Sequence, residues 1–347
     1  MLDRDTIQGV AMFTVLEAGR TYRIDAELVD GRLIAAADRP LLGWEPRSYG
    51  WCRDDACLPA SRAAGAERDG GIDVVAFAEL TGRIAVLDAA ERVLALGHTA
   101  TGLSAAAAPD FTLDGTTLSD HRGSKVALVF WASWCGCRYD LPAWQERHAA
   151  LASQGFTVIS VAADRNAEDA RPWIDEAEVT HPALIDVDGV VAELYNVINV
   201  PTVVWIDEEG RIVRPQDTQT ATDLFRSMNG LDSQASLDAL RRWVTEGDAG
   251  LTPGQVAEHL RVPTAAEQKA RAHARLGVWL ARGGKPDAAR RHLAAAGDLA
   301  PHDLAIRRGL MPVTGEDPFG DAFFAIRGEL EEAGIPIYRP LPLPDRA

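Results

Sequence analysis

The sequence is poor in lysine and contains no long apolar run. Lysine occurs only at Lys125, Lys269 and Lys285, and 35 basic residues stand against 51 acidic ones, so the formal net charge is −16. A surface of this charge repels phosphate groups, which argues against nucleic acid or an anionic membrane as a partner. No segment approaches the roughly 18 uninterrupted apolar residues that cross a bilayer. The sequence therefore predicts no nucleic-acid partner and no membrane partner.

The chain also has little cysteine and no export signal at its start. Residues 1–5 lack the basic and apolar segments of a secretory signal, so we expect a cytoplasmic protein, and the excess of arginine over lysine favours a bacterial source. Four cysteines in 347 residues are too few for a disulfide scaffold. They form two close pairs, Cys52/Cys57 and Cys135/Cys137. In a cytosolic chain, such pairs indicate redox or metal chemistry.

The length of 347 residues, at about 150 residues per domain, predicts two or three domains. In the first hundred residues, short strand patterns are mixed with one helical pattern. Strands and helices then alternate regularly, which is typical of a layered α/β domain with parallel strands. The remainder has helical apolar spacing and a proline-rich end. We predict a small mixed α+β domain over 1–104, an α/β domain over 105–228, and a helical domain with an extended tail over 229–347.

The densest functional pattern follows a buried strand predicted over 125–132. Cys135 comes directly after this strand, where a helix begins. The partial positive charge and free N–H groups of a helix N-terminus stabilise a thiolate, and Arg138, one turn further on, adds to this effect. A lowered thiol pKa is what a nucleophilic cysteine requires at neutral pH.

These residues resemble the thioredoxin superfamily, specifically its TlpA/ResA-like branch. The resemblance covers roughly residues 105–216, about a third of the chain, and implies a thioredoxin-like fold for the α/β domain. Four motifs in the expected order carry it: Ala108-Pro109-Asp110-Phe111, Leu118-Ser119-Asp120 before Arg122-Gly123, Trp131 to Pro142, and Val200-Pro201-Thr202 before Ile206-Asp207.

The resemblance also implies how the substrate is held. Pro201 matches the cis-proline that lies beside the cysteines in this family, and its neighbours Val200 and Thr202 then frame the groove where the extended backbone of a substrate docks. Trp131 and Trp134 would shield and shape the site.

The sequence departs from the family pattern at two positions. The usual Cys-x-x-Cys is shortened to Cys135-Gly136-Cys137, and Val129 stands where thioredoxins carry a buried aspartate. TlpA/ResA-like proteins place an acid three residues after the second cysteine, and Asp140 matches it, which implies proton transfer to or from Cys137. The alternative for Asp140 is an ordinary aspartate on the helix surface. Residues i and i+2 of a helix point apart, so the two cysteines can join only through a non-helical backbone, which Gly136 permits. The disulfide is predicted to be strained and easily reduced.

We therefore predict a thiol–disulfide oxidoreductase in which Cys135 attacks and Cys137 resolves, because related ResA-like proteins carry Sec-Gly-Cys at this place. The substrate would be a protein or small-molecule disulfide or a peroxide-derived species. The electron donor is unknown, no cofactor or metal is expected, and a homo-oligomer is left open.

Three alternatives to this enzyme remain. Paired thiolates suit a soft metal or a partner protein without turnover, although no histidine lies within ten residues of the pair. A peroxiredoxin-like thiol peroxidase is the second, although Ala132 and Leu128 stand where that family has Thr or Ser and Pro. The third is an assembly module with a vestigial redox site.

The second cysteine pair has two interpretations. Cys52 and Cys57, five residues apart in a polar loop, could form a second redox pair that exchanges electrons with the first. They could equally be half-buried thiols or a disulfide that clips the loop.

The helical region contains a tetratricopeptide-like hairpin. A single hairpin cannot bury its apolar face alone, so we expect it to pack on neighbouring helices or on the α/β domain rather than to capture peptides. The positions that match the repeat are Leu276, Gly277, Leu280, Gly284, Ala289, Leu293, Ala296 and Pro301.

Overall fold

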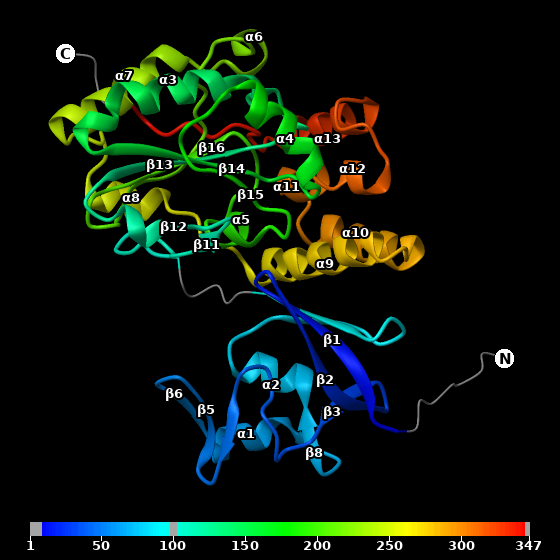
Figure 1. Cartoon of the computed structure of the whole chain (residues 1–347). Coiled ribbons are helices and arrows are strands. Elements are labelled where there is room, and N and C mark those ends of the chain that lie inside the picture. Colours follow the sequence, from blue (N-terminus) through cyan, green and yellow to red (C-terminus); the bar gives the residue numbers. More distant parts are fainter. Residues whose placement is uncertain (1–8, 98–102, 344–347) are drawn as a thin grey trace. The chain divides into compact units, whose positions relative to one another are not determined.

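The computed structural model describes residues 9–97 and 103–343, so residues 1–5 and the end of the predicted tail lie outside it. The chain forms two compact units (Figure 1): 1–99 with 264–299, and 100–263 with 300–347. This differs from the three consecutive domains expected over 1–104, 105–228 and 229–347. The difference arises because the C-terminal region is divided between the two units.

The first unit is built on a seven-stranded sheet with the order β7-β8-β3-β2-β1-β10-β9. Strands β1 and β10 pair in parallel, and the other pairs in this sheet are antiparallel. A separate three-stranded sheet, β4-β5-β6, carries the first cysteine pair. The strands are β1 (Ala11–Glu17), β2 (Arg20–Val29), β3 (Arg32–Ala35), β4 (Glu45–Arg47), β5 (Gly50–Arg53), β6 (Ala56–Pro59), β7 (Glu67–Arg68), β8 (Gly71–Asp73), β9 (Ala85–Asp88) and β10 (Val93–Leu96).

Helices cover both faces of the seven-stranded sheet. On one face Phe77 of α2 (Val74–Leu80) packs with sheet residues such as Phe13 and Leu33, and α1 (Ala60–Ala63) lies nearby. On the other face lies a hairpin of α9 (Ala265–Arg282) and α10 (Pro286–Leu299), the segment where a tetratricopeptide-like repeat was predicted, and its Leu276 packs with Val93. The hairpin was expected on neighbouring helices or on the α/β domain. It buries its apolar face on the N-terminal sheet instead.

The second unit contains a five-stranded sheet with the order β15-β14-β13-β16-β17, which gives the thioredoxin-like α/β fold. Strands β13, β14 and β15 are parallel, whereas β16 and β17 are antiparallel to their neighbours. A small hairpin, β11 (Thr112–Leu113) and β12 (Thr116–Thr117), precedes the sheet. The sheet strands are β13 (Lys125–Trp131), β14 (Phe156–Ala162), β15 (Ala183–Ile185), β16 (Thr202–Ile206) and β17 (Ile212–Asp217).

Successive side chains of β13 belong alternately to two hydrophobic cores, one on each face of the sheet. Val129 packs with Trp144 of α3 (Leu141–Leu151) and Trp243 of α7 (Ser233–Glu246), and these two helices cover one face of the sheet (Figure 1). Leu128 and Phe130 contribute to the core on the opposite face. The helices of that face are α4 (Ala167–Glu176), α5 (Val190–Leu194) and α8 (Pro253–His259).

After the α9–α10 hairpin, the chain returns to the second unit. Three helices follow, and Leu304, Phe323 and Leu330 form a small core between them. An extended segment then runs over residues 336–343, in agreement with the predicted tail. These helices are α11 (Leu304–Arg307), α12 (Met311–Thr314) and α13 (Asp321–Glu332), and α6 (Arg226–Asn229) lies earlier in the same unit.

No helix among residues 9–97 and 103–343 has the length and apolar character needed to cross a membrane.

Candidate active site

The Cys135/Cys137 pair lies where strand β13 leads into helix α3. Cys135 has extended backbone, with φ −121° and ψ 145°, and caps a short 3₁₀ helix, η4 (Gly136–Asp140), that continues into α3. Its Sγ accepts a hydrogen bond from the Cys137 N–H at 3.2 Å, and its thiol donates to the Val200 carbonyl at 3.5 Å. The predicted position at a helix N-terminus is confirmed, with a first turn of the tighter 3₁₀ form.

The two thiols are free, buried and unequal in acidity. Burial raises the pKa of Cys135, but hydrogen bonds from the thiol and backbone N–H of Cys137 and the charge of Arg308 outweigh it, so the pKa is lowered. For Cys137, burial and its hydrogen bond to Cys135 raise the pKa well above its usual value. Cys135 therefore loses its proton first, while Cys137 keeps its own.

Gly136 has a different role from the one expected. It does not adopt a positive φ, and the departure from helical geometry occurs at Cys135. A Cβ atom at Gly136 would lie only 2.5 Å from the ring of Phe225. Glycine at this position thus allows an aromatic ring to approach the backbone between the two cysteines.

Arg308, rather than Arg138, supplies the positive charge that lowers the pKa of Cys135. The Arg138 guanidinium lies 4.2 Å from the centre of the Trp173 ring and donates to the Ser133 carbonyl. Arg308 follows helix α11 and is buried. Sequence reasoning missed it because no local pattern connects residue 308 with residue 135.

Arg308 is held by one hydrogen bond and by aromatic rings. Its Nε donates to the Pro318 carbonyl at 2.8 Å, and its guanidinium lies 3.7 Å from the centre of the Phe323 ring. The Trp134 ring centre is 5.7 Å away. Desolvation by burial lowers the pKa of Arg308, and the neighbouring thiols oppose that shift. The charge is thus kept close to Cys135 in a largely apolar setting.

Asp140 is buried rather than placed on the helix surface. Burial raises its pKa to about 6, and hydrogen bonds from Thr222 and Ala221 only partly oppose this. The Ala221 N–H donates to Oδ2 at 3.1 Å, and the Thr222 hydroxyl donates to Oδ1. A carboxyl group with this pKa can accept or release a proton near neutral pH.

The structure gathers part of the predicted substrate groove around the cysteines. The Val200–Pro201 peptide bond is cis, as the resemblance implied. Pro201 lines the same cavity as Cys135, Cys137 and Asp140, and Val200 contributes its carbonyl. The other predicted groove residues stand apart from the cavity lining: Trp131 and Trp134 are buried in the core, and the Thr202 hydroxyl turns back to the Asn199 carbonyl at 2.7 Å.

The cavity beside the thiols has a volume of about 300 Å³. Six of its 17 lining residues are aromatic, and they come from segments that lie far apart in the sequence. Sequence reasoning missed them, although the spacing of aromatic residues over 319–324 was visible. They are Tyr139, Phe225, Phe319, Phe323, Phe324 and Tyr338.

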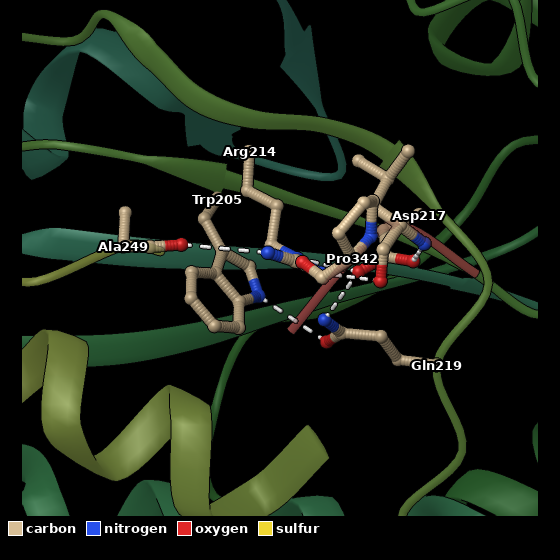
Figure 2. Close-up of polar contacts among 7 residues, drawn as sticks. Trp205, Arg214, Asp217, Gln219, Ala249 and Pro342 are labelled. Carbon is tan, nitrogen blue, oxygen red and sulfur yellow. Dashed lines mark hydrogen bonds and ion pairs between the residues drawn. The ribbon is translucent and has the colours of Figure 1, made fainter. Parts of the chain in front are cut away.

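A buried polar network anchors the tail that carries Tyr338 (Figure 2). Arg214 and Asp217 of β17, both with almost no exposed side-chain surface, form an ion pair. The Arg214 Nη2 donates to the carbonyls of Leu341 and Pro342, each at 3.0 Å. The Leu341 N–H donates to Asp217 Oδ1 at 2.7 Å, and Gln219 donates to the other carboxylate oxygen at 2.7 Å. The tail is therefore fixed to the sheet.

A second buried carboxyl group supports the loop before Cys135. Asp164 accepts hydrogen bonds from the Ser133 N–H at 3.0 and 3.2 Å and from its hydroxyl. Burial raises the pKa of Asp164 to about 6. No sequence pattern singles this residue out, because it stands in a loop outside the motifs of the family.

Cys52 and Cys57 form a disulfide across the β5–β6 hairpin of the first unit. The alternative that Cys52 and Cys57 are half-buried free thiols is therefore wrong. The bond agrees with the interpretation that a disulfide clips the loop. Across residues 9–97 and 103–343, no cluster of three or more His, Cys, Asp or Glu side chains could hold a metal ion.

Comparisons with known proteins also relate the second unit to thioredoxin-like proteins, the family that its motifs resemble. The AhpC/TSA family model matches residues 105–214. The chain is 36% identical over 130 residues to the thioredoxin-like protein YneN of Bacillus subtilis, a match that covers 35% of this chain and 74% of YneN. It is 35% identical over 116 residues to the thiol-disulfide oxidoreductase ResA of Oceanobacillus iheyensis, covering 30% of this chain and 60% of that ResA.

Among solved structures, the chain is similar to the pneumococcal exposed lipoprotein thioredoxin Etrx1 of Streptococcus pneumoniae. The identity is 31%, the TM-score is 0.32, and the match covers 39% of this chain and 99% of that one. The chain thus belongs to the thioredoxin-like family that includes YneN, and it is a thiol–disulfide oxidoreductase related to ResA.

Proposed function

We propose that this oxidoreductase reduces disulfides with Cys135 as the nucleophile, Cys137 as the resolving thiol and Asp140 as the proton acceptor. The observation that carries the proposal is the unequal acidity of two adjacent buried thiols, since Cys135 is acidified while the pKa of Cys137 is raised. A thiolate attacks a disulfide, whereas a thiol does not. The sulfur that ionises first is therefore the one that attacks.

The reaction has two steps. The Cys135 thiolate attacks one sulfur of the substrate disulfide, forms a mixed disulfide and releases the other sulfur as a thiolate. The Cys137 thiol then gives its proton to the Asp140 carboxylate, and its sulfur attacks Cys135 Sγ, so that the remaining substrate sulfur leaves. The substrate gains two electrons and the protein keeps a Cys135–Cys137 disulfide. An external dithiol must reduce that disulfide before the next turnover.

Trapping the mixed disulfide tests these assignments. The Cys137→Ser variant, treated with a disulfide substrate, should accumulate one substrate thiol on Cys135, detected by mass spectrometry of the intact chain. The Cys135→Ser variant should accumulate none. The Cys52→Ser/Cys57→Ser double variant is the matched control and should form the Cys135–Cys137 disulfide normally. A stable adduct on Cys137 in the Cys135→Ser variant, formed at the wild-type rate, would reverse the assignment.

A thiol peroxidase is a second candidate, favoured by the acidified Cys135 beside the Arg308 guanidinium. The thiolate would attack a peroxide oxygen, form a sulfenic acid and release water or an alcohol. Condensation with Cys137 would then expel water and leave the same protein disulfide. Stopped-flow mixing of the reduced protein with hydrogen peroxide distinguishes a thiol peroxidase from a disulfide reductase. A rate no faster than that of a free thiol at the same degree of ionisation argues against this second activity.

A further inference from the structure

The segment that follows α10 covers the loop beside the reactive cysteines. The Ala305 N–H donates to the Ile198 carbonyl at 3.0 Å, and the Asn199 side-chain amide donates to the Ile337 carbonyl at 2.9 Å. Ile198 and Asn199 stand directly before the cis peptide bond. The backbone beside Pro201, where the resemblance implied docking of an extended substrate, is thus partly occupied by the chain itself.

The covering segment is held firmly by buried polar contacts. The Arg214–Asp217 pair fixes residues 341 and 342 (Figure 2), and Thr218 and Arg339 exchange two hydrogen bonds, at 2.9 and 3.3 Å. Tyr338 lies in this anchored stretch and faces the cavity. A protein substrate that laid its backbone against residues 198 and 199 would have to displace the contacts of Ala305 and Ile337.

The space that remains is small and mostly apolar, although Arg138, Asp140 and Arg308 also line it. Cys135 and Cys137 are only 6% and 7% exposed, and the cavity beside them measures about 300 Å³. This is the lower end of the volumes found for pockets that hold small organic ligands.

The rim of the cavity is also apolar. Four of its lining residues, Tyr139, Met228, Phe319 and Phe324, keep between 42% and 53% of their surface exposed. Large hydrophobic side chains gathered around one opening mark an interaction site, and the small cavity that they surround suits an apolar ligand. Phe225 continues this wall inward to the backbone of Gly136, next to both thiols.

From these observations, and resting on the function proposed above, we infer that the substrate is a small organic disulfide with an aromatic or bulky apolar arm, rather than a protein disulfide. The arm lies against Phe225 and Phe324, and the disulfide reaches the Cys135 sulfur at the base of the cavity. The chemical steps are those given above: the small disulfide takes two electrons and leaves as two thiols, and the protein keeps the Cys135–Cys137 disulfide.

Two synthetic disulfides that differ only in one arm test this inference in the full-length reduced protein. Methyl 2-phenylethyl disulfide and methyl 2-hydroxyethyl disulfide have similar alkyl leaving groups, so a free thiol should react with both at nearly the same rate. Single-turnover rates, measured by quenching and counting the remaining protein thiols, should favour the phenyl compound at least tenfold, the ratio expected when a buried ring contributes about 1.4 kcal/mol. Insulin, a protein disulfide, should be reduced more slowly than either compound.

Variants locate the preference. Phe225→Ala should reduce the phenyl-to-hydroxyethyl ratio severalfold, whatever its effect on the rate with the hydroxyethyl compound. Leu224→Ala, an exposed neighbour outside the cavity lining, is the matched control and should keep the wild-type ratio.

The outcomes separate the two proposals. A ratio near one in the wild-type protein, or insulin reduced faster than both small disulfides, would overturn the inferred substrate class and leave the oxidoreductase assignment intact. If none of the three compounds oxidises Cys135 and Cys137, although both react with iodoacetamide after denaturation, the proposed function itself fails.

Discussion

The two cysteine pairs differ in what determines their state. Cys52 and Cys57 face each other directly in the β5–β6 hairpin, and the register of two short strands places their Cα atoms 4.1 Å apart. Cys135 and Cys137 are closer in sequence, yet they are free thiols whose acidity depends on Arg308, which lies in a distant part of the chain. Local pairing is enough to place a disulfide. A pair of unequal thiols requires a buried environment assembled from several segments.

This difference predicts that changes in tertiary contacts alter the reactivity of Cys135 and Cys137 and leave the Cys52–Cys57 disulfide intact. Changes in the hairpin should do the reverse.

The largest effect is expected from Arg214→Met. Removal of this guanidinium leaves the Asp217 carboxyl group buried without its charged partner and releases the carbonyls of residues 341 and 342. Breaking a buried ion pair in this way costs about 3–5 kcal/mol. Urea unfolding followed by tryptophan fluorescence should show the loss, because Trp205 stacks on Trp243 in the same core. Mass spectrometry should still find the Cys52–Cys57 disulfide.

Two further variants control this experiment. Arg211→Met removes an exposed arginine that pairs with Asp207 and should destabilise the protein much less. Replacing both partners, as in Arg214→Met/Asp217→Leu, should recover much of the lost stability, because no buried charge is then left alone. A double variant as unstable as the single one would show that the hydrogen bonds to the tail, rather than the charge, dominate.

A smaller effect is expected from the double variant Cys52→Ser/Cys57→Ser. A disulfide that closes so short a loop stabilises a protein by about 2 kcal/mol, chiefly by restricting the unfolded chain. Hydrogen exchange should therefore increase in the β5–β6 hairpin. Single-turnover reduction of a small disulfide by the second pair should not change.

The same double variant tests whether the first pair exchanges electrons with the second. If the pair is a relay, multiple turnover driven by a physiological dithiol should fall while the single-turnover rate stays constant. A pair that acts only as a clip should leave both rates as they are.

Arg308→Met is expected to lower the reactivity of Cys135 about tenfold at neutral pH. The charge of Arg308 favours the thiolate, so its loss should raise the pKa of the thiol, and a tenfold loss of reactivity corresponds to about 1.4 kcal/mol. The pH dependence of alkylation by iodoacetamide measures this shift. Arg308→Lys should restore part of the reactivity of Cys135. The matched control is Arg307→Met, which removes the neighbouring arginine that pairs with Glu329. An unchanged alkylation profile in Arg308→Met would assign the acidity to the hydrogen bonds from the thiol and the backbone N–H of Cys137.

Sequence patterns were sufficient where a single segment determines the outcome. The buried strand over 125–131, the helix over 141–151 and the cis bond before Pro201 all follow from the local sequence or from the family motif. The position of Cys135 at a helix N-terminus follows from the same run of residues.

The features that were missed depend on contacts between distant segments. Arg308 and Tyr338 reach the cysteines from the end of the chain, after the α9–α10 hairpin has packed on the other unit's sheet. Burial of Gly136 under Phe225 likewise joins residues that no motif connects. Periodicity tells which face of an element is apolar, but it does not tell which partner covers that face.

The smallest change is expected from Asp140→Asn, and it concerns pH dependence more than the maximal rate. Burial raises the pKa of Asp140 to about 6, so the carboxyl group is neutral below that pH and cannot accept the Cys137 proton. The resolving step should therefore accelerate as the pH rises through about 6. The Asp140→Asn substitution should remove this inflection and slow the step severalfold at pH 7. Decay of the mixed disulfide in quenched samples isolates the step, with Asp169→Asn, on the exposed start of α4, as the control.

The raised pKa of Asp140 also has a consequence for stability. Because folding raises the pKa from 3.8 to about 6, wild-type stability should fall as the pH rises from about 4 to about 6 and level off above that, so Asp140→Asn should gain stability relative to wild type over this interval and keep the gain at higher pH. Urea unfolding at several pH values measures this gain. If the kinetic inflection persists in Asp140→Asn, the proton moves to another group, and the buried Asp164, whose pKa is also about 6, is the next residue to replace.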